Sequence, residues 1–298
     1  MHLRAVGLTD KGIVRSENQD SFLVQILPCS SNKNSLLAIV ADGVGGENAG
    51  NIASMTAVEV IKTFDLDDDE NLNDTLKKAI EAANSEIYGL SCRNADYKGM
   101  ATTCSTLMIK GDKAIIAHVG DSRVYRIKDG IIEALTEDHT LPVKLYKSGY
   151  ISDSELEGHP QSNVLTNALG SKNKVEIDII TTSLMENDTY VLCSDGLYKY
   201  LTSEEINEIV TNASLDSSAE KLIALANSRG GDDNITVVVV KAGHNNVSNK
   251  TVRIDGDEFS TEVVQKVSTG SRTFIRLLLV LLFFMVVIVF ISFNFNWL

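Results

Sequence analysis

Short apolar runs, most of them rich in Val and Ile, alternate with polar turns as far as residue 241. Gly-Asp, Lys-Asp-Gly and Asp-Ser turns favour antiparallel hairpins over crossover connections. Helical periodicity is confined to stretches near the two ends of this region, each beginning near Ser, Asn or Thr. We predict strands at 3–8, 21–27, 36–41, 104–110, 113–119, 124–128, 131–135, 175–180, 189–193 and 235–241, and helices at 51–64, 72–90, 203–211 and 218–228.

This order of elements predicts an α+β fold. Strands dominate the centre and helices bracket them, which suits a central antiparallel β-sandwich flanked by helices on both outer faces, in α/β/β/α layers. The chain of 298 residues is long enough to bury a sizeable core. We predict three parts, namely a globular domain at 1–242, a polar tether at 243–270 and a membrane anchor at 271–298.

The anchor is predicted from one apolar run near the C-terminus. Residues 277–293 read LLLVLLFFMVVIVFISF, with Ser292 as the single polar residue, and their number is at the short end of what spans a bilayer. A buried core helix is the alternative. Lys266, Arg272 and Arg276 precede the run and no basic residue follows it, so we expect the globular domain on the cytoplasmic side. The N-terminus lacks an apolar run of signal-peptide length, which agrees with that side.

Charge and cysteine content exclude several classes of protein. Acidic residues outnumber basic ones by 40 to 27, so the net charge is −13 and binding to a nucleic-acid backbone is not expected. The four cysteines stand apart from one another and form no C-x-x-C pair. A disulfide scaffold and a zinc site are therefore not expected.

Five aspartates stand at the ends of predicted strands. Asp42, Asp121 and Asp195 follow apolar runs, whereas Asp20 and Asp233 come just before them. One such aspartate is usually a turn residue. Five that converge without basic partners would repel each other unless divalent cations lay between them, and oxygen ligands select Mg²⁺ or Mn²⁺ over zinc. The pattern therefore predicts a site for two Mg²⁺ or Mn²⁺ ions.

Two such ions predict phosphate ester hydrolysis. Ions about 3.5–4 Å apart can share a water, lower its pKa and stabilise an in-line displacement at phosphorus. Arg15, five residues before Asp20, is the candidate for binding the phosphate, with a surface arginine as the alternative. Other phosphate-binding motifs are incomplete, because Asn48 replaces the third glycine of a dinucleotide fingerprint and no cysteine has an arginine six residues later. His118 and His139 are expected in core or turn roles.

Five motifs in order resemble those of the metal-dependent protein serine/threonine phosphatases of type 2C (the PPM family). They are GIVRSENQD at 12–20, ADGVGG at 41–46, GDSR at 120–123, CSDGL at 193–197 and GDDNIT at 231–236. Two lesser motifs, TEDH at 136–139 and HPQSNVLT at 159–166, are similar to the bacterial branch of that family. The resemblance extends from residue 1 to about residue 241.

The resemblance implies a β-sandwich flanked by helix pairs, with the metal site in a cleft at one edge. It implies that Asp42, Asp195 and Asp233 bind the first ion, and that Asp42 and the Gly43 carbonyl bind the second. Asp121, together with Asp195, would form a third, weaker metal site.

The resemblance also implies roles outside the metal ligands. Asp20 would hold a water on the metal, Arg15 would bind the substrate phosphate, and residues 141–160 would correspond to a mobile flap beside the cleft. The chain departs from the family pattern at Gln19, where many members have glutamate, and at Val44, where eukaryotic members have histidine. No general acid is assigned for that reason.

The function expected from these observations is hydrolysis of phosphoserine and phosphothreonine on proteins by a metal-activated water. The partners would be phosphorylated proteins that a serine/threonine kinase modifies, and the membrane through 277–293. A catalytically decayed, membrane-tethered phosphoprotein-binding module is the alternative, motivated by Gln19 and Val44. A metal-dependent nuclease or small-molecule phosphatase is disfavoured by the acidic domain, which has no basic or aromatic track for nucleic acid.

Overall fold

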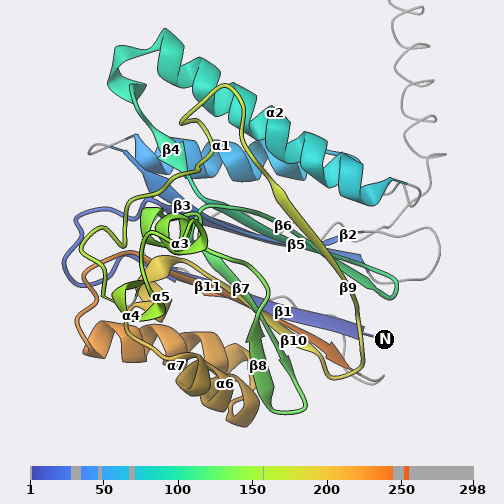
Figure 1. Cartoon of the computed structure of the whole chain (residues 1–298). Helices are drawn as coiled ribbons and strands as arrows, with labels where there is room; N and C mark the ends of the chain where they lie inside the picture. Colours follow the sequence, from blue (N-terminus) through green and yellow to red (C-terminus); the bar gives the residue numbers. More distant parts are fainter. Residues whose placement is uncertain are drawn as a thin grey trace, which may run out of the picture. The chain divides into compact units, whose positions relative to one another are not determined.

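The computed structural model describes residues 2–27, 35–45, 49–66, 71–156 and 158–243, and the backbone of Val252–Ile254. The chain builds two β-sheets (Figure 1). The first has the order β12 (Val252–Ile254), β1 (His2–Asp10), β11 (Ile235–Gly243), β10 (Thr189–Cys193), β7 (Arg123–Lys128) and β8 (Ile131–Ala134). The second has the order β2 (Asp20–Leu27), β3 (Ser35–Val44), β5 (Cys104–Lys110), β6 (Lys113–Val119) and β9 (Asp178–Ser183), with β4 (Ala101–Thr102) paired to β3.

Helices cover the outer faces of both sheets, as predicted. The second sheet carries α1 (Gly50–Lys62) and α2 (Leu72–Arg93), and the first carries α5 (Asp195–Tyr198), α6 (Ser203–Asn212) and α7 (Leu215–Ser228) (Figure 1). One apolar cluster lies under each helical layer and a third lies between the sheets. All strand pairings in the described part are antiparallel except that of β1 with β12, so the α+β sandwich is confirmed.

Burial on both faces explains why the central strands read as continuous apolar runs. Along β11, Val237 and Val239 belong to the cluster under the helices, whereas Val238 and Val240 belong to the cluster between the sheets. Successive side chains of a strand point to opposite faces. A strand between two apolar layers therefore needs apolar residues at every position rather than at alternate ones.

Capping side chains determine where α6 and α7 begin. The Thr202 side chain accepts a hydrogen bond from the Glu205 backbone N–H, and the Glu205 carboxylate accepts one from the Thr202 N–H, so α6 begins with a capping box. The Ser214 hydroxyl caps α7 through the Ser217 N–H. This helix therefore begins at Leu215, three residues before the predicted start.

The last strand of the second sheet was predicted too early. It is Asp178–Ser183 rather than 175–180, because it pairs with β6 in a register that joins Lys113 to Ser183. Val175 and Ile177 instead pack against the apolar cluster under α1 and α2. An apolar run shows that a segment is buried, but pairing with a neighbour decides which of its residues form the strand.

Two predicted segments contain secondary structure that the sequence pattern did not predict. Residues 141–160, expected as a flap, contain α3 (Leu141–Lys147) and α4 (Asp153–Leu156). Three residues of the predicted tether, Val252–Ile254, form β12 beside β1.

In the part of the chain that the structure describes, no helix is long and apolar enough to cross a membrane. The predicted anchor at 277–293 lies outside the described residues.

Candidate active site

Asp20 connects the two sheets at one edge of the sandwich. It is the first residue of β2 and lies opposite Asp42 of β3 in the strand register. Its Oδ2 accepts hydrogen bonds from the Ser194 hydroxyl at 2.7 Å and the Thr236 hydroxyl at 2.6 Å. Ser194 follows β10 and Thr236 belongs to β11, so both donors come from the other sheet. These contacts bring the ends of four strands to one place.

The backbone around Asp42 is held by hydrogen bonds on both sides. Its N–H donates to the Thr103 hydroxyl at 2.9 Å, and its carbonyl accepts from the Thr102 hydroxyl at 2.9 Å. The next residue, Gly43, donates its N–H to the Gln19 carbonyl at 3.1 Å. A Cβ at Gly43 would lie 2.1 Å from the Gly50 carbonyl oxygen, so only glycine permits the start of α1 to approach β3 this closely.

Asp195 and Asp233 share a lysine that the sequence analysis did not identify. Lys199 Nζ lies 2.6 Å from Asp195 Oδ2 and 3.2 Å from Asp233 Oδ2, and its side chain is 27% exposed. The Arg15 guanidinium lies 2.9 Å from Asp233 Oδ1 and donates through Nε to the Asp232 carbonyl at 3.2 Å. The premise that the converging carboxylates have no basic partners is therefore wrong.

One asparagine fixes the loop that carries Arg15. The Asn234 side-chain amide donates to the carbonyls of Lys11 at 3.0 Å and Glu17 at 2.9 Å, and its Oδ1 accepts the Gln19 N–H at 2.9 Å. The residue next to Asp233 therefore ties the Arg15 loop at three points. Arg15 itself stays 52% exposed, which leaves its guanidinium accessible to a ligand.

Asp121 lies beside a second wall of the site. It is 6% exposed, and its carbonyl accepts the Tyr198 hydroxyl at 3.0 Å. Asp121, Tyr198 and Lys199 line a cavity of about 430 Å³ together with residues from α3 and α4, including Pro142 and Asp153. The expected flap thus forms one wall of a cavity whose other wall carries a predicted metal ligand.

The electrostatics show that all five aspartates converge. Burial raises the pKa of Asp20 to about 7, although the Thr236 and Ser194 hydrogen bonds oppose this. Burial, followed by the charge of Asp195, also raises the pKa of Asp121 to about 7. The pKa of Asp42 is raised well above its usual range by burial and then by the other four carboxylates, and burial raises that of Asp195.

The carboxylate cluster favours the charged form of Lys199, whereas it disfavours the charged form of the aspartates. Burial alone would lower the pKa of its ammonium group, but the ion pairs with Asp195 and Asp233 raise that pKa above its usual range. The charge of Lys199 in turn opposes the rise in the pKa of Asp195 and of Asp121. The cluster therefore holds more negative charge than its internal cation neutralises.

These residues fit divalent cations in their chemistry but are not arranged around one. Asp20 Oδ1 and Asp195 Oδ1 are buried without a hydrogen-bond partner, and all the candidate ligands are oxygens, as Mg²⁺ and Mn²⁺ prefer. Yet within the described ranges no group of three or more His, Cys, Asp or Glu side chains is placed to hold a metal ion. Asp195 and Asp233 pair instead with Lys199 and Arg15.

The remaining candidates lie outside the carboxylate cluster. His118 is fully buried, between the Ser105 hydroxyl and the Glu137 carbonyl, and His139 supports Gly120, so both have the structural roles expected. Val44, which departs from the pattern of the eukaryotic members, is 45% exposed. The three cysteines in the described part are free.

The sequence contained one signal for Lys199, its i,i+4 spacing from Asp195 at a helix start. It contained no comparable signal for Ser194 and Thr236 as partners of Asp20, because residues 174 and 216 positions away in the chain must meet it.

A sandwich of this topology with five carboxylates and an arginine at one edge defines a metal-dependent phosphatase. A family profile described as Protein phosphatase 2C matches residues 13–253. The serine/threonine phosphatase stp of Listeria monocytogenes is 38% identical over 239 residues, which cover 78% of this chain and 93% of that protein. The protein phosphatase PhpP of Streptococcus pneumoniae is 37% identical over 238 residues, which cover 78% and 95%.

Solved structures agree with these relatives. The serine/threonine phosphatase of S. agalactiae superposes with a TM-score of 0.75 at 39% identity, covering 81% of this chain and 100% of that one. The catalytic domain of the phosphatase PstP, solved with two manganese ions, superposes with a TM-score of 0.70 at 33% identity, covering 81% and 99%. The chain belongs to the protein phosphatase 2C family, and it is a metal-dependent protein serine/threonine phosphatase resembling bacterial Stp and PhpP.

Proposed function

We propose that this phosphatase hydrolyses phosphoserine and phosphothreonine at the carboxylate cluster with two Mn²⁺ or Mg²⁺ ions. The observation that carries the proposal is the excess of buried carboxylate charge, with Asp20 Oδ1 and Asp195 Oδ1 left without partners. Carboxylates whose pKa is raised by burial and mutual repulsion are stabilised in the ionised form when cations are added. The two manganese ions of the related PstP structure support the same number here.

The ligands we propose are those that the family resemblance implies. Asp42, Asp195 and Asp233 would hold the first ion, and Asp42 and the Gly43 carbonyl would hold the second. When bound, such ions lower the pKa of a water and stabilise charge that develops on the phosphoryl group. Asp195 keeps Oδ1 free for this role while its Oδ2 contacts Lys199, whereas Asp233 must give up a contact, because its two oxygens pair with Arg15 and Lys199.

Two residues act on the substrate side of the cluster. Asp20 Oδ2 is occupied by its two hydroxyl donors, so Asp20 Oδ1 is the atom that can accept a hydrogen bond from the attacking water. Arg15 can bind phosphate oxygens through two N–H groups, because its guanidinium is half exposed and its loop is tied down by Asn234. We assign no general acid.

A third, weaker metal ion at Asp121 and Asp195, which the family resemblance implies, would also compete with Lys199. Lys199 already lies 2.6 Å from Asp195 and lines the same cavity as Asp121. A third divalent ion would therefore meet a cation at close range, which is unfavourable in a partly buried site.

The membrane proposal is supported by the sequence alone. The apolar run at 277–293 would anchor the chain through a single pass, the tether at 243–270 would connect it to the domain at 1–242, and the basic residues before the run would keep the domain on the cytoplasmic side. There the enzyme would act on proteins phosphorylated by a cytoplasmic serine/threonine kinase.

The test is hydrolysis of a phosphothreonine peptide by the full-length chain with Mn²⁺, compared with an Asp195→Asn variant. Asp195→Asn keeps the size of the side chain but removes its charge, so we expect kcat/KM to fall by at least about 100-fold. Equal rates for the two proteins would contradict the proposed site. A decayed binding module would instead bind the phosphopeptide equally well in EDTA and in Mn²⁺, as calorimetry would show, and would release no phosphate.

A further inference from the structure

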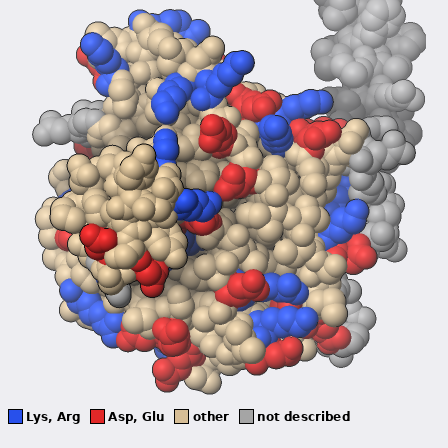
Figure 2. All heavy atoms as spheres, in the orientation of Figure 1, with Lys and Arg blue, Asp and Glu red and all other residues tan. Residues whose placement is uncertain are grey.

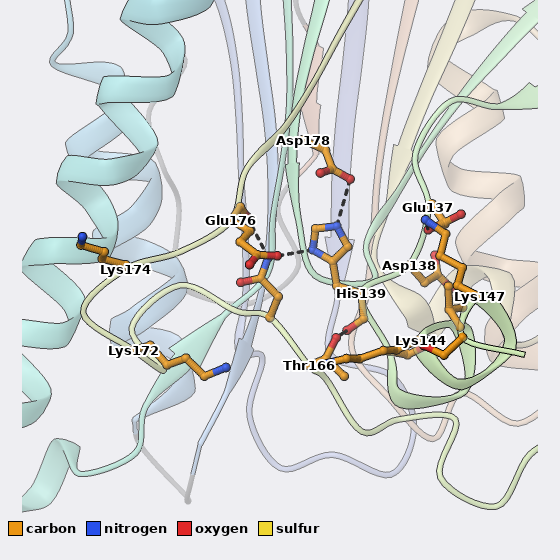
Figure 3. A pocket seen from close by; sticks show the side chains of 14 residues that line it. Glu137, Asp138, His139, Lys144, Lys147, Thr166, Lys172, Lys174, Glu176 and Asp178 are labelled. Atoms are coloured by element: carbon orange, nitrogen blue, oxygen red, sulfur yellow. Dashed lines mark hydrogen bonds and ion pairs between the residues drawn. The ribbon is translucent and has the colours of Figure 1, made fainter. Parts of the chain in front are cut away.

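A second cavity of about 470 Å³ is lined by residues of α3 and of the segments before α3 and before β9 (Figure 3). Asp138, Thr140 and Val143 line both this cavity and the one that contains Asp121 and Lys199. The two cavities therefore share a wall, formed by the start of α3 and the residues before it. The second cavity contains none of the residues assigned to the reaction.

His139 lines this second cavity, and its ring is held in place by hydrogen bonds rather than free to react. His139 Nδ1 accepts the Gly120 N–H at 3.2 Å and the Asn167 side-chain amide at 2.9 Å, and its Nε2 lies 3.1 Å from Asp178 Oδ2 (Figure 3). Because Nδ1 accepts two hydrogen bonds, the ring carries its proton on Nε2 and donates it to Asp178. Both ring nitrogens therefore have hydrogen-bond partners, and His139 forms a fixed part of the cavity wall.

Among the charged side chains that line this cavity, lysines without an ion pair outnumber carboxylates without one. Lys147 pairs with Glu137, and Arg123 pairs with Asp138 through two hydrogen bonds. Asp178 accepts a hydrogen bond from the neutral ring of His139 and keeps its negative charge. Four other charged side chains line the cavity without an ion pair among the described residues, namely Lys144, Lys172, Lys174 and Glu176. Three ammonium groups therefore face two carboxylates, those of Glu176 and Asp178, although the whole chain has a net charge of −13.

The lysines reach the cavity from two different elements. Lys144 belongs to α3, whereas Lys172 lies in the loop before β9 and points into the cavity, and the Lys174 ammonium group turns toward its outer rim (Figure 3). On this face of the molecule, basic side chains stand among acidic ones between α3 and α2 (Figure 2). An anion inside the cavity would lie between lysines that belong to separate segments.

We infer that this cavity binds a second phosphoryl group of the same phosphoprotein substrate while the first is hydrolysed. The inference rests on the proposed function of the neighbouring carboxylate cluster. A phosphoryl group carries a charge of about −1.5 to −2 at pH 7 and presents three acceptor oxygens, so it can be shared by lysines on opposite walls. A carboxylate offers one charge and two oxygens. Because the two cavities share lining residues, we expect one peptide segment to reach from the reacting phosphate to the second cavity.

The experiment measures kcat and KM of the full-length chain with Mn²⁺ on phosphothreonine peptides of one sequence. At a second position, two to five residues away on either side, the peptides carry alanine, glutamate or a non-hydrolysable phosphonate analogue of phosphothreonine. At the best spacing we expect KM for the phosphonate peptide to be about tenfold below that for the alanine peptide, with glutamate well short of this. Because the lysines are exposed, added salt should reduce the difference.

The variant that tests the cavity combines Lys144→Gln with Lys172→Gln. We expect it to lose the KM advantage of the phosphonate peptide, whereas Lys221→Gln, an exposed lysine of α7, keeps it. Three results would each overturn the inference: no preference for phosphonate over alanine at any spacing, the full preference in the double variant, or a glutamate peptide equal to the phosphonate peptide.

A separate measurement shows whether a negative result means that the cavity does not bind the phosphonate or that the active site does not hydrolyse the peptide. Calorimetry with a peptide that carries phosphonate at both positions compares the wild-type chain and the double variant without turnover. Weaker binding by the double variant supports the cavity even if no peptide is hydrolysed, and equal binding refutes it. Hydrolysis of p-nitrophenyl phosphate by the wild-type chain reports on the carboxylate cluster alone.

Discussion

Lys199 bridges Asp195 and Asp233, with its ammonium nitrogen 2.6 Å from one carboxylate and 3.2 Å from the other. The lysine stands four residues after Asp195, at the end of the short helix α5 that Asp195 begins. An internal cation thus holds together two carboxylates that come from separate strand ends. The same two carboxylates are the proposed ligands of the first metal ion.

Removal of this internal cation should strengthen metal binding. In Lys199→Gln, a divalent ion no longer competes with an ammonium group for Asp195 and Asp233, so we expect the Kd for Mn²⁺ to fall by about tenfold. Titration of the metal-free protein followed by electron paramagnetic resonance of free Mn²⁺ measures this. Lys221→Gln is the matched control at an exposed position. An unchanged or higher Kd in Lys199→Gln would show that Lys199 does not compete.

Arg15 should affect the substrate more than the metal. Arg15→Lys keeps the positive charge beside Asp233 but loses the planar pair of N–H donors, so we expect kcat/KM for p-nitrophenyl phosphate to fall by about 10- to 100-fold. The Kd for Mn²⁺, measured in parallel, should change by less than about threefold. A large change in Mn²⁺ affinity with little change in kcat/KM would reverse the role proposed for this residue.

The hydroxyl of Thr236 should stabilise the edge of the sandwich. Thr236→Val keeps the shape of a buried side chain but leaves Asp20 Oδ2 with Ser194 as its remaining hydroxyl donor. We expect the free energy of unfolding to fall by about 1.5–3 kcal/mol, as for other hydrogen bonds to charged groups, measured by urea denaturation with EDTA. Thr211→Val, on the exposed end of α6, is the control. A loss no larger than in this control would mean that Asp20 does not depend on Thr236.

His118 should make the fold less stable in mild acid. Burial, and then the neighbouring His139, lowers the pKa of His118 from 6.5 to about 4, while the Glu137 carbonyl and Asp178 oppose this. Below pH 6.5 the unfolded chain therefore binds a proton at this residue that the folded chain does not. Stability is lost as the pH falls from about 6.5 to about 4, by a total on the order of 3 kcal/mol.

The measurement for His118 is urea denaturation with Mn²⁺ at pH 7 and pH 5. The difference in unfolding free energy between the two values should be smaller in His118→Gln than in wild type, whatever the absolute stability of the variant. His159→Gln, at a half-buried position outside the core, should behave as wild type. A His118→Gln variant with the full wild-type dependence on pH would show that another group titrates.

The C-terminal run should determine where the enzyme is found. Deletion of residues 271–298 should move the protein from the membrane fraction to the supernatant while Mn²⁺-dependent hydrolysis of a phosphopeptide persists. For the full-length chain, protease added to the cytoplasmic side should digest the domain, as the basic residues before the run imply. A full-length chain found in the supernatant would contradict the anchor, and a protected domain would contradict its side.

Local patterns in the sequence determined most of the strands, the layer order and the identity of the acidic cluster. β5, β6 and β10 begin and end as predicted, because buried strands are rich in apolar residues and the turns between strands favour Gly and Asp. The aspartates could be identified in the same way, since each stands at the end of such a run.

Only the tertiary structure decided which polar groups meet. The contacts of Asp20 with its hydroxyl partners and of Lys199 with Asp233, and the approach of Lys144 to the Lys172 loop, each join segments that are separate in the chain. β9 began three residues later than predicted for the same reason, since pairing with β6 set its register. Periodicity records whether a residue is buried, which depends on its own segment. A contact depends on two segments at once, and it is specified only when the sheets pack together.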